Sequence, residues 1–134
     1  MRLASEQADK LIAATRTKAK AIGIALSVAI LDSAGHMKAF SRMDGAWLGS
    51  IDGALRKART SILFEAETQS IWDICKPGAQ ARGLEHTNGG LATFVGGIPL
   101  RAANGDLLGA IGVSGGQVEQ DFAVASAGAA SLPA

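Results

Sequence analysis

The sequence predicts an α+β fold in which a central antiparallel sheet of about five strands is flanked by helices. Apolar runs of strand length are joined by tight-turn signals, so neighbouring strands should be antiparallel. Helical periodicity does not follow every strand, which disfavours a parallel Rossmann-like sheet. The expected order is α-β-β-α-loop-β-β-β-α. Since neither a repeat nor a linker interrupts the pattern, residues 1–134 are expected to form one domain.

The first third of the chain predicts a helix and a β-hairpin. Apolar side chains at helical spacing indicate an amphipathic helix over residues 4–22. Residues 24–31 form a continuous apolar run of strand length. Residues 36–43 return after a turn rich in small and polar residues, so the two runs should pair as a hairpin.

The middle third predicts a second helix followed by a long irregular segment. The helix should begin at Ser50, which is suited to capping it, and fade near residue 66. Its apolar face is expected to carry Ile51, Leu55, Ala58 and Ile62. Beyond it, a short helix is predicted over residues 68–75, within an otherwise irregular stretch over 67–92. A loop of this length in a small domain is usually functional or contacts another subunit.

The last third predicts strand at 93–95, at 98–102 and, after an Asn-Gly turn, at 107–113. A final helix should run from about 117 to 130. Ser114 precedes that helix and is expected to be its N-cap, or alternatively to mark free N–H groups that could hold a carboxylate.

Composition disfavours several classes of function. The chain has 13 Lys and Arg against 12 Asp and Glu, and no cluster of basic residues, so no nucleic-acid partner is expected. No apolar run approaches the ~20 residues of a membrane span, and the N-terminus is charged where a signal peptide would be apolar. Cys75 is the single cysteine, which excludes an internal disulfide. We therefore expect a cytoplasmic protein without a membrane segment.

Known catalytic signatures are missing from the sequence. It contains no Walker loop, HExxH, GxSxG or paired-histidine metal motif. The glycines of residues 109–115 do not match GxGxxG and lie within a predicted hairpin strand, so dinucleotide binding is not expected.

Several segments occur in the order seen in one known family: AIGIALSVAILDSAGHMKAFSRMDGA (21–46), ALRKARTSILF (54–64), GLEHTNGG (83–90), GGIPL (96–100), NGDLLGAIGVSGG (104–116) and EQDFAVASAG (119–128). Through these segments the chain resembles the GlcG/HbpS family, which includes the C-terminal domain of PduO-type proteins. The segment GLEHTNGG is most similar to the PduO-like branch.

The resemblance implies a profilin- or PAS-like α+β fold and a tendency to form homo-oligomers. Several members of the family bind haem, one branch is linked to haem degradation, and the PduO-like branch is associated with cobalamin-dependent diol metabolism. The resemblance therefore implies a small-ligand-binding domain, with haem or a related tetrapyrrole as the leading ligand. Since fold alone does not determine function, the residues are weighed separately.

His86 is the leading candidate for an iron ligand, because neutral imidazole is the commonest axial donor to haem. The alternative is a loop histidine bonded to nearby backbone. The expected pocket lies between the sheet, the second helix and the loop around His86. Arg42 or Lys57 would then meet the propionates. Alternatively, Arg42 pairs with Asp44, and Lys57 belongs to a solvated helix face.

A small-metabolite enzyme is the second hypothesis. Arg42 would orient a carboxylate while one of the acid–base candidates moves a proton. Those candidates are His86, Lys57, Glu119 and Asp121. The negative charges of Glu119 and Asp121 are equally explained by the dipole of the last helix. Three other possible ligands have simpler explanations: His36 as a turn residue, Cys75 as a buried thiol and Met43 as core.

Overall fold

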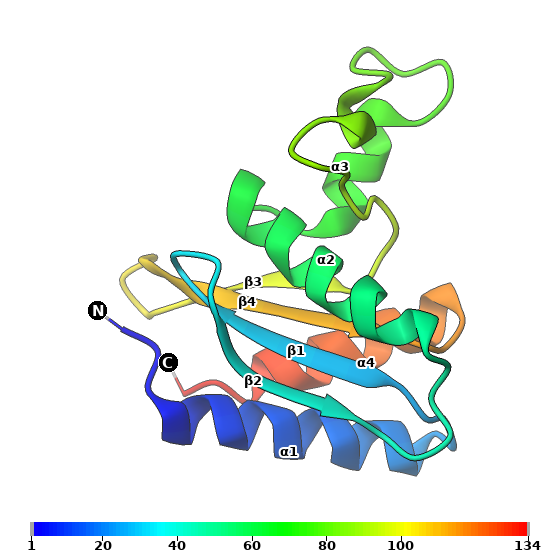
Figure 1. Cartoon of the computed structure of the whole chain (residues 1–134). Coiled ribbons are helices and arrows are strands. Elements are labelled where there is room, and N and C mark those ends of the chain that lie inside the picture. The colour runs from blue at the N-terminus through cyan, green and yellow to red at the C-terminus, as the bar shows by residue number, and fades with distance from the viewer. Residues whose placement is uncertain (1, 134) are drawn as a thin grey trace.

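A four-stranded antiparallel sheet forms the centre of the protein (Figure 1). The computed structural model describes residues 2–133. The strand order is β2-β1-β4-β3, so the two long apolar segments of the sequence lie in the middle. The strands are β1 (Ser27–Asp32), β2 (Met37–Arg42), β3 (Gly97–Arg101) and β4 (Leu107–Ser114).

Helices cover both faces of this sheet. Helices α1 (Ser5–Ala21) and α4 (Val118–Ala130) pack side by side on one face, and α2 (Gly49–Phe64) crosses the other (Figure 1). Helix α3 (Thr68–Cys75) and the 3₁₀ turn η1 (Leu84–His86) lie in a lobe beyond α2. Two layers of helix therefore enclose the sheet, and the lobe projects away from it.

The two faces of the sheet are packed differently. Because successive side chains of a strand point to opposite faces, Val28 and Ile30 of β1 enter the large core beneath α1 and α4, whereas Ala29 faces α2. The core on the α2 side is built mainly from alanines. A Cβ on Gly112 of β4 would lie 2.0 Å from the carbonyl oxygen of Ala54, so α2 sits almost on the backbone of the sheet.

This close approach corrects the predicted orientation of α2. The predicted apolar residues Ile51, Leu55 and Ile62 are only half-buried. The buried side chains of α2 are all small except that of Lys57: Ser50, Ala54, Lys57, Ala58, Thr60 and Ser61. Only small residues fit where a helix lies this close to a sheet. The larger apolar residues of α2 therefore lie on the neighbouring, half-buried face of the helix, and their periodicity predicts that face instead of the one in contact with the sheet.

The prediction of about five strands also needs correction, because residues 93–95 are not a strand. Phe94 is exposed, and Gly96 adopts a positive φ of 131° that redirects the chain before β3 begins. The predicted hairpins and all four predicted helices are present, the short one over the predicted residues 68–75. Across residues 2–133, no helix has both the length and the apolar character needed to cross a bilayer.

The irregular segment lies in the lobe beyond α2, so the loop around His86 does not close a pocket against the sheet as predicted. It packs against α3 through Ile71, Cys75 and Leu91, which form a small core separate from the main one. Two arginines of α2 anchor it: Arg56 donates to the carbonyls of Gly89 and Gly90, both at 2.9 Å. Arg59 donates to the carbonyl of Asn88 at 2.8 Å in the same way.

Replacing Gly112 with alanine tests the close packing of α2. The new Cβ would meet backbone atoms of α2, which cannot rotate away, so we expect a loss of at least about 2 kcal/mol in the free energy of unfolding. Urea denaturation measures it. The control is Gly49→Ala, where a Cβ meets nothing within 4 Å and the change should stay within about 0.5 kcal/mol. Equal stability of the two variants would contradict the packing.

Candidate functional site

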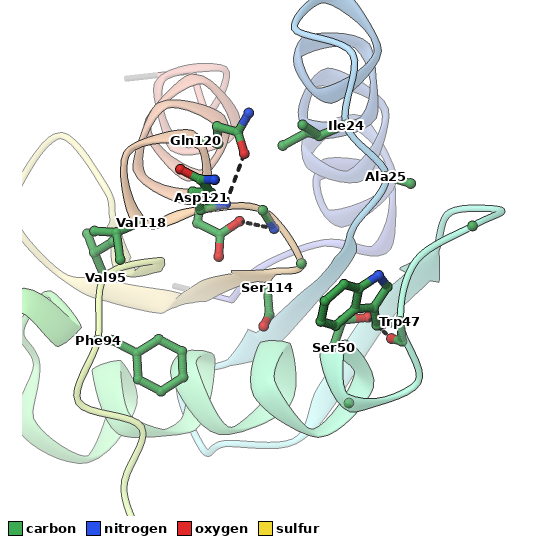
Figure 2. Close-up of a pocket in the computed structure, with 15 residues that line it drawn as sticks. Ile24, Ala25, Trp47, Ser50, Phe94, Val95, Ser114, Val118, Gln120 and Asp121 are labelled. Atoms are coloured by element: carbon green, nitrogen blue, oxygen red, sulfur yellow. Dashed lines mark hydrogen bonds between the residues drawn. The ribbon is translucent and has the colours of Figure 1, made fainter.

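A cavity of about 610 Å³ opens at one end of the sheet (Figure 2). Its walls come from the segment before β1, the loop before α2, the segment before β3, and the link between β4 and α4. The volume falls in the usual range for small-ligand sites, about 300–1,000 Å³. The cavity therefore lies where four separate segments of the chain converge.

Aromatic rings flank this cavity. Trp47 is 81% exposed and Phe94 is 53% exposed, although both line the cavity. In the view of Figure 2 they lie on opposite sides of the space, with Ser114 between them. Ile24, Val95 and Val118 add further apolar surface. Exposed aromatic faces around an apolar hollow are typical of a binding site for a flat, largely apolar ligand.

A buried ion pair lies at the base of the cavity. Lys57 is fully buried, and its Nζ lies 3.1 Å from Oδ2 of Asp121. The same ammonium donates to the carbonyl of Val113 at 2.8 Å and lies 4.6 Å from the centre of the Phe94 ring. Asp121 lines the cavity and accepts a hydrogen bond from the N–H of Gly116 at 2.8 Å. Lys57 and Asp121 are thus both well bonded, and together they carry no net charge.

Burial shifts the pKa of each partner in the direction that favours its neutral form. Desolvation lowers the pKa of Lys57 below its usual value, and the charge and hydrogen bond of Asp121 oppose that shift. Desolvation likewise raises the pKa of Asp121, while Lys57 and the backbone N–H of Gly116 oppose it. Each charge is therefore tolerated at this depth because the other is present.

Three of the residues predicted for the site meet here. Ser114 and Asp121 line the cavity, and Lys57 lies directly behind Asp121. The alternative for Lys57, a place on a solvated helix face, is wrong, because its side chain is completely buried. The signal for this was in the sequence: position 57 follows Ala54 and precedes Ser61 at helical spacing, on a stripe of small residues.

The remaining predicted residues lie outside the cavity. Arg42 is exposed at the end of β2, and Glu119 is exposed on the first turn of α4. His86 is exposed in η1, on the projecting lobe. A smaller hollow of about 320 Å³ does lie between α2 and the loop near His86, but Arg56 and Arg59 in its wall are already bonded to loop carbonyls.

The predicted capping role of Ser114 is also wrong. Ser114 ends β4, and the N-cap of α4 is Gln117. The N–H of Gln117 donates to Oε1 of Gln120 at 2.9 Å, while that of Gly116 is bonded to Asp121. These two N–H groups are therefore satisfied by the helix's own side chains and are not free to hold a ligand carboxylate. The aromatic pair that sequence reasoning missed, Trp47 and Phe94, lies in irregular segments without periodicity.

Comparison with known proteins places this architecture in a family. The family model described as "Haem degrading protein HbpS-like" matches residues 3–130. The chain belongs to the HbpS-like family. The resemblance to the GlcG/HbpS family inferred from sequence segments is thereby confirmed.

Individual relatives of this HbpS-like chain are similar along most of its length. A 15.0 kDa protein from the dhaT-dhaS intergenic region of Citrobacter freundii is 39% identical over 85% of this chain and 80% of that protein. The corrinoid adenosyltransferase PduO of Salmonella typhimurium is 36% identical over 92% of this chain, but only 37% of PduO is covered. The solved PduOC:heme complex is 34% identical, with a TM-score of 0.92 over 98% of this chain and 95% of that one.

Replacing Asp121 with asparagine tests the ion pair. Lys57 would remain buried without a counter-charge, so we expect a loss of about 3–5 kcal/mol in the free energy of unfolding near pH ~7. Without Asp121 the pKa of folded Lys57 falls further, so the unfolded state binds more protons at neutral pH. Stability relative to the wild type should therefore recover as the pH rises from ~7 to ~9.5.

Urea denaturation at both pH values measures this recovery. The matched control is Glu119→Gln, which removes an exposed carboxylate from the same turn of α4 and should change stability by no more than about 0.5 kcal/mol. If Asp121→Asn loses the same free energy of unfolding relative to the wild type at both pH values, the unpaired charge of Lys57 is not the source of the loss.

Proposed function

We propose that this protein binds a flat tetrapyrrole, with haem as the leading ligand, in the cavity between Trp47 and Phe94. The observation that carries the proposal is the pair of exposed aromatic rings across an apolar hollow. The family description refers to haem degradation, and a homologue of 34% identity forms a complex with haem. Both support haem as the first ligand to test.

The lining suits the ring of haem. Trp47 and Phe94 offer aromatic faces on which a flat conjugated ring can pack, and Ile24 and Val118 supply aliphatic contacts. Asp121 adds no net charge to the base of the cavity, because Lys57 neutralises it. Haem, when bound, supplies an iron centre whose reactivity depends on its axial ligand and on the polarity around it.

The carboxylate edge of haem should face the open mouth of the cavity. Among residues 2–133, no lysine, arginine or histidine lines the cavity. Lys57 is behind Asp121 and Phe94 and is already engaged, so a propionate pushed inward would be buried without a partner, at a substantial cost. Propionates directed to the mouth remain hydrated. Arg42, exposed and outside the cavity, could meet them only at the rim.

The proposed role of His86 as an iron ligand remains a prediction. Its side chain is exposed on the lobe and outside the cavity, so it would have to come from a second copy of the chain. Self-association is itself part of the proposal, because two exposed apolar residues neighbour lining residues along the chain. Leu48 is 72% exposed beside Trp47, and Phe122 is exposed one turn beyond Val118.

A corrinoid is the second ligand to test. Relatives of this chain include corrinoid adenosyltransferases, of which the chain spans well under half. A corrin is also a tetrapyrrole, but its axial groups make it thicker than a porphyrin. Competition between a cobalamin and haem for the purified protein therefore separates a haem-handling role from an accessory role in corrinoid metabolism.

Substituting the rim aromatics tests the site. Trp47→Ala and Phe94→Ala each remove a ring face, so each should weaken haem binding by about tenfold, which corresponds to about 1.4 kcal/mol. Titration followed at the Soret band measures the dissociation constant. The matched control is Trp72→Ala, since Trp72 is an exposed tryptophan that shares a neighbouring hollow with Phe94 but does not line the cavity.

His86→Ala belongs to the same series. Unchanged affinity in Trp47→Ala and Phe94→Ala, together with a large loss in His86→Ala, would move the binding site from the cavity to the lobe. Size-exclusion chromatography with light scattering, with and without haem, shows whether the rim is an interface between copies.

A further inference from the structure

The chain contains two asparagines, Asn88 and Asn104, and each is followed by glycine. Asparagine before glycine is prone to spontaneous deamidation, because glycine has no side chain to hinder attack by its backbone nitrogen. Both asparagines are exposed, so access to water does not distinguish them. The hydrogen bonds around the two pairs are different, and this difference determines which of them can react.

We propose that Asn88 is a site of spontaneous deamidation, activated by Arg59, and that Asn104 is protected by its turn. In this reaction the backbone nitrogen of Gly89 attacks Cγ of Asn88 and loses its proton to water. The bond between Cγ and Nδ2 breaks, and the nitrogen takes up a proton and leaves as ammonia. The resulting succinimide adds water at one of its two carbonyls, which gives aspartate or isoaspartate. Water is the only co-reactant, and the modification does not depend on a ligand in the cavity.

Arg59 favours the attacking form of Gly89. Its Nη1 donates to the backbone carbonyl oxygen of Asn88 at 2.8 Å. That oxygen belongs to the same peptide group as the nitrogen of Gly89. When the nitrogen loses its proton, the negative charge is therefore shared with the oxygen that the guanidinium binds. A hydrogen bond from a permanently charged donor stabilises this anion, so Arg59 assists the first step of the reaction.

The two groups that react at Asn88 and Gly89 are free to approach each other. Within residues 2–133, the side-chain amide of Asn88 makes one hydrogen bond, from Nδ2 to the hydroxyl of the adjacent Thr87 at 2.9 Å, and the N–H of Gly89 makes none. A Cβ built on Gly89 meets nothing within 4 Å, so its surroundings are open. The bonds from Arg56 and Arg59 hold this loop by its backbone carbonyls and leave both reacting groups untouched.

The corresponding groups of Asn104 and Gly105 are held apart by their turn. Oδ1 of Asn104 accepts a hydrogen bond from the N–H of Asp106 at 3.0 Å, and Nδ2 donates to the carboxylate of Asp106 at 3.1 Å. The N–H of Gly105 donates to the carbonyl of Ala102 at 2.9 Å. Attack by this nitrogen on Cγ would have to break all three bonds, so the turn slows the reaction.

Isoaspartate at position 88 changes how the lobe is anchored. It lengthens the main chain of that residue by one atom, directly before the carbonyls of Gly89 and Gly90 that Arg56 binds. It also converts the carbonyl bound by Arg59 into a free carboxylate. The three arginine–carbonyl bonds cannot all persist in their present positions, so the lobe should open more readily once the site has reacted.

Ageing of the full-length protein tests the proposal. The purified protein is kept in a mildly alkaline buffer at physiological temperature, and peptide mass spectrometry follows the conversion of each asparagine. We expect Asn88 to react at least about tenfold faster than Asn104 in the folded protein, which corresponds to a difference of about 1.4 kcal/mol in the barrier. The same chain unfolded in guanidinium chloride is the reference, and there the two rates should converge.

Arg59→Gln separates activation from flexibility of the loop. Loss of the guanidinium should slow the reaction at Asn88 about tenfold and leave that at Asn104 unchanged, because a hydrogen bond from a charged donor to the developing anion is removed. The matched control is Arg56→Gln, which removes an anchor of the same loop but does not touch the reacting peptide group, and it should not slow the reaction.

Each part of the proposal has an outcome that contradicts it. Equal rates at Asn88 and Asn104 in the folded protein, or a faster rate at Asn104, overturn the assignment of the site. A rate at Asn88 that is the same in Arg59→Gln and the wild type overturns the activation by Arg59. Hydrogen exchange of the aged protein should be faster in the lobe than before ageing, and unchanged exchange overturns the effect on its anchoring.

Discussion

The ion pair between Lys57 and Asp121 determines how the two layers of helix meet. Lys57 belongs to α2 on one face of the sheet and Asp121 to α4 on the other, so their contact passes around the ends of β4 and β3. A buried pair of this kind contributes little net stability, because desolvation offsets the attraction between the charges. Its main effect is therefore to position the two helices. The pair holds the start of α4 close to the middle of α2, and the cavity lies beside this contact.

The glycines near Lys57 follow from its burial. A Cβ on Gly96 would lie 2.9 Å from Nζ of Lys57 and 2.5 Å from the carbonyl oxygen that Nζ binds. A Cβ on Gly97 would lie 2.5 Å from the carbonyl of Lys57 itself. Residues 96 and 97 must therefore lack a side chain, because the side chain of Lys57 occupies the space between α2 and the sheet. The two glycines that open the segment GGIPL, which carried part of the family resemblance, are thus explained by packing around one lysine. The cavity lies one step further out, where Phe94 covers that lysine.

Much of the fold could be predicted from the sequence, but little of the site. Turn signals and apolar runs located the hairpins and helices because these are local patterns. The periodicity of large apolar residues does not predict the buried face of α2, because α2 contacts the sheet through Ala54, Ala58 and Lys57. Trp47 and Phe94 lie in irregular segments, so no period could reveal that they face one cavity. His86 stood out as a histidine in a glycine-rich loop, yet the position of that loop depends on the long-range bonds from Arg56 and Arg59.

The separate core of the lobe has a consequence for how the protein opens. Ile71, Cys75 and Leu91 are buried together, but away from the residues that hold the sheet and its helices. Detaching this unit exposes only a few apolar side chains and breaks the arginine–carbonyl bonds, so it needs less free energy than global unfolding. Amide hydrogens of the lobe should exchange through this local opening while those of β1 and β4 remain protected. Burial is the main cause of the raised pKa of the Cys75 thiol, so this thiol becomes reactive only while the lobe is locally open.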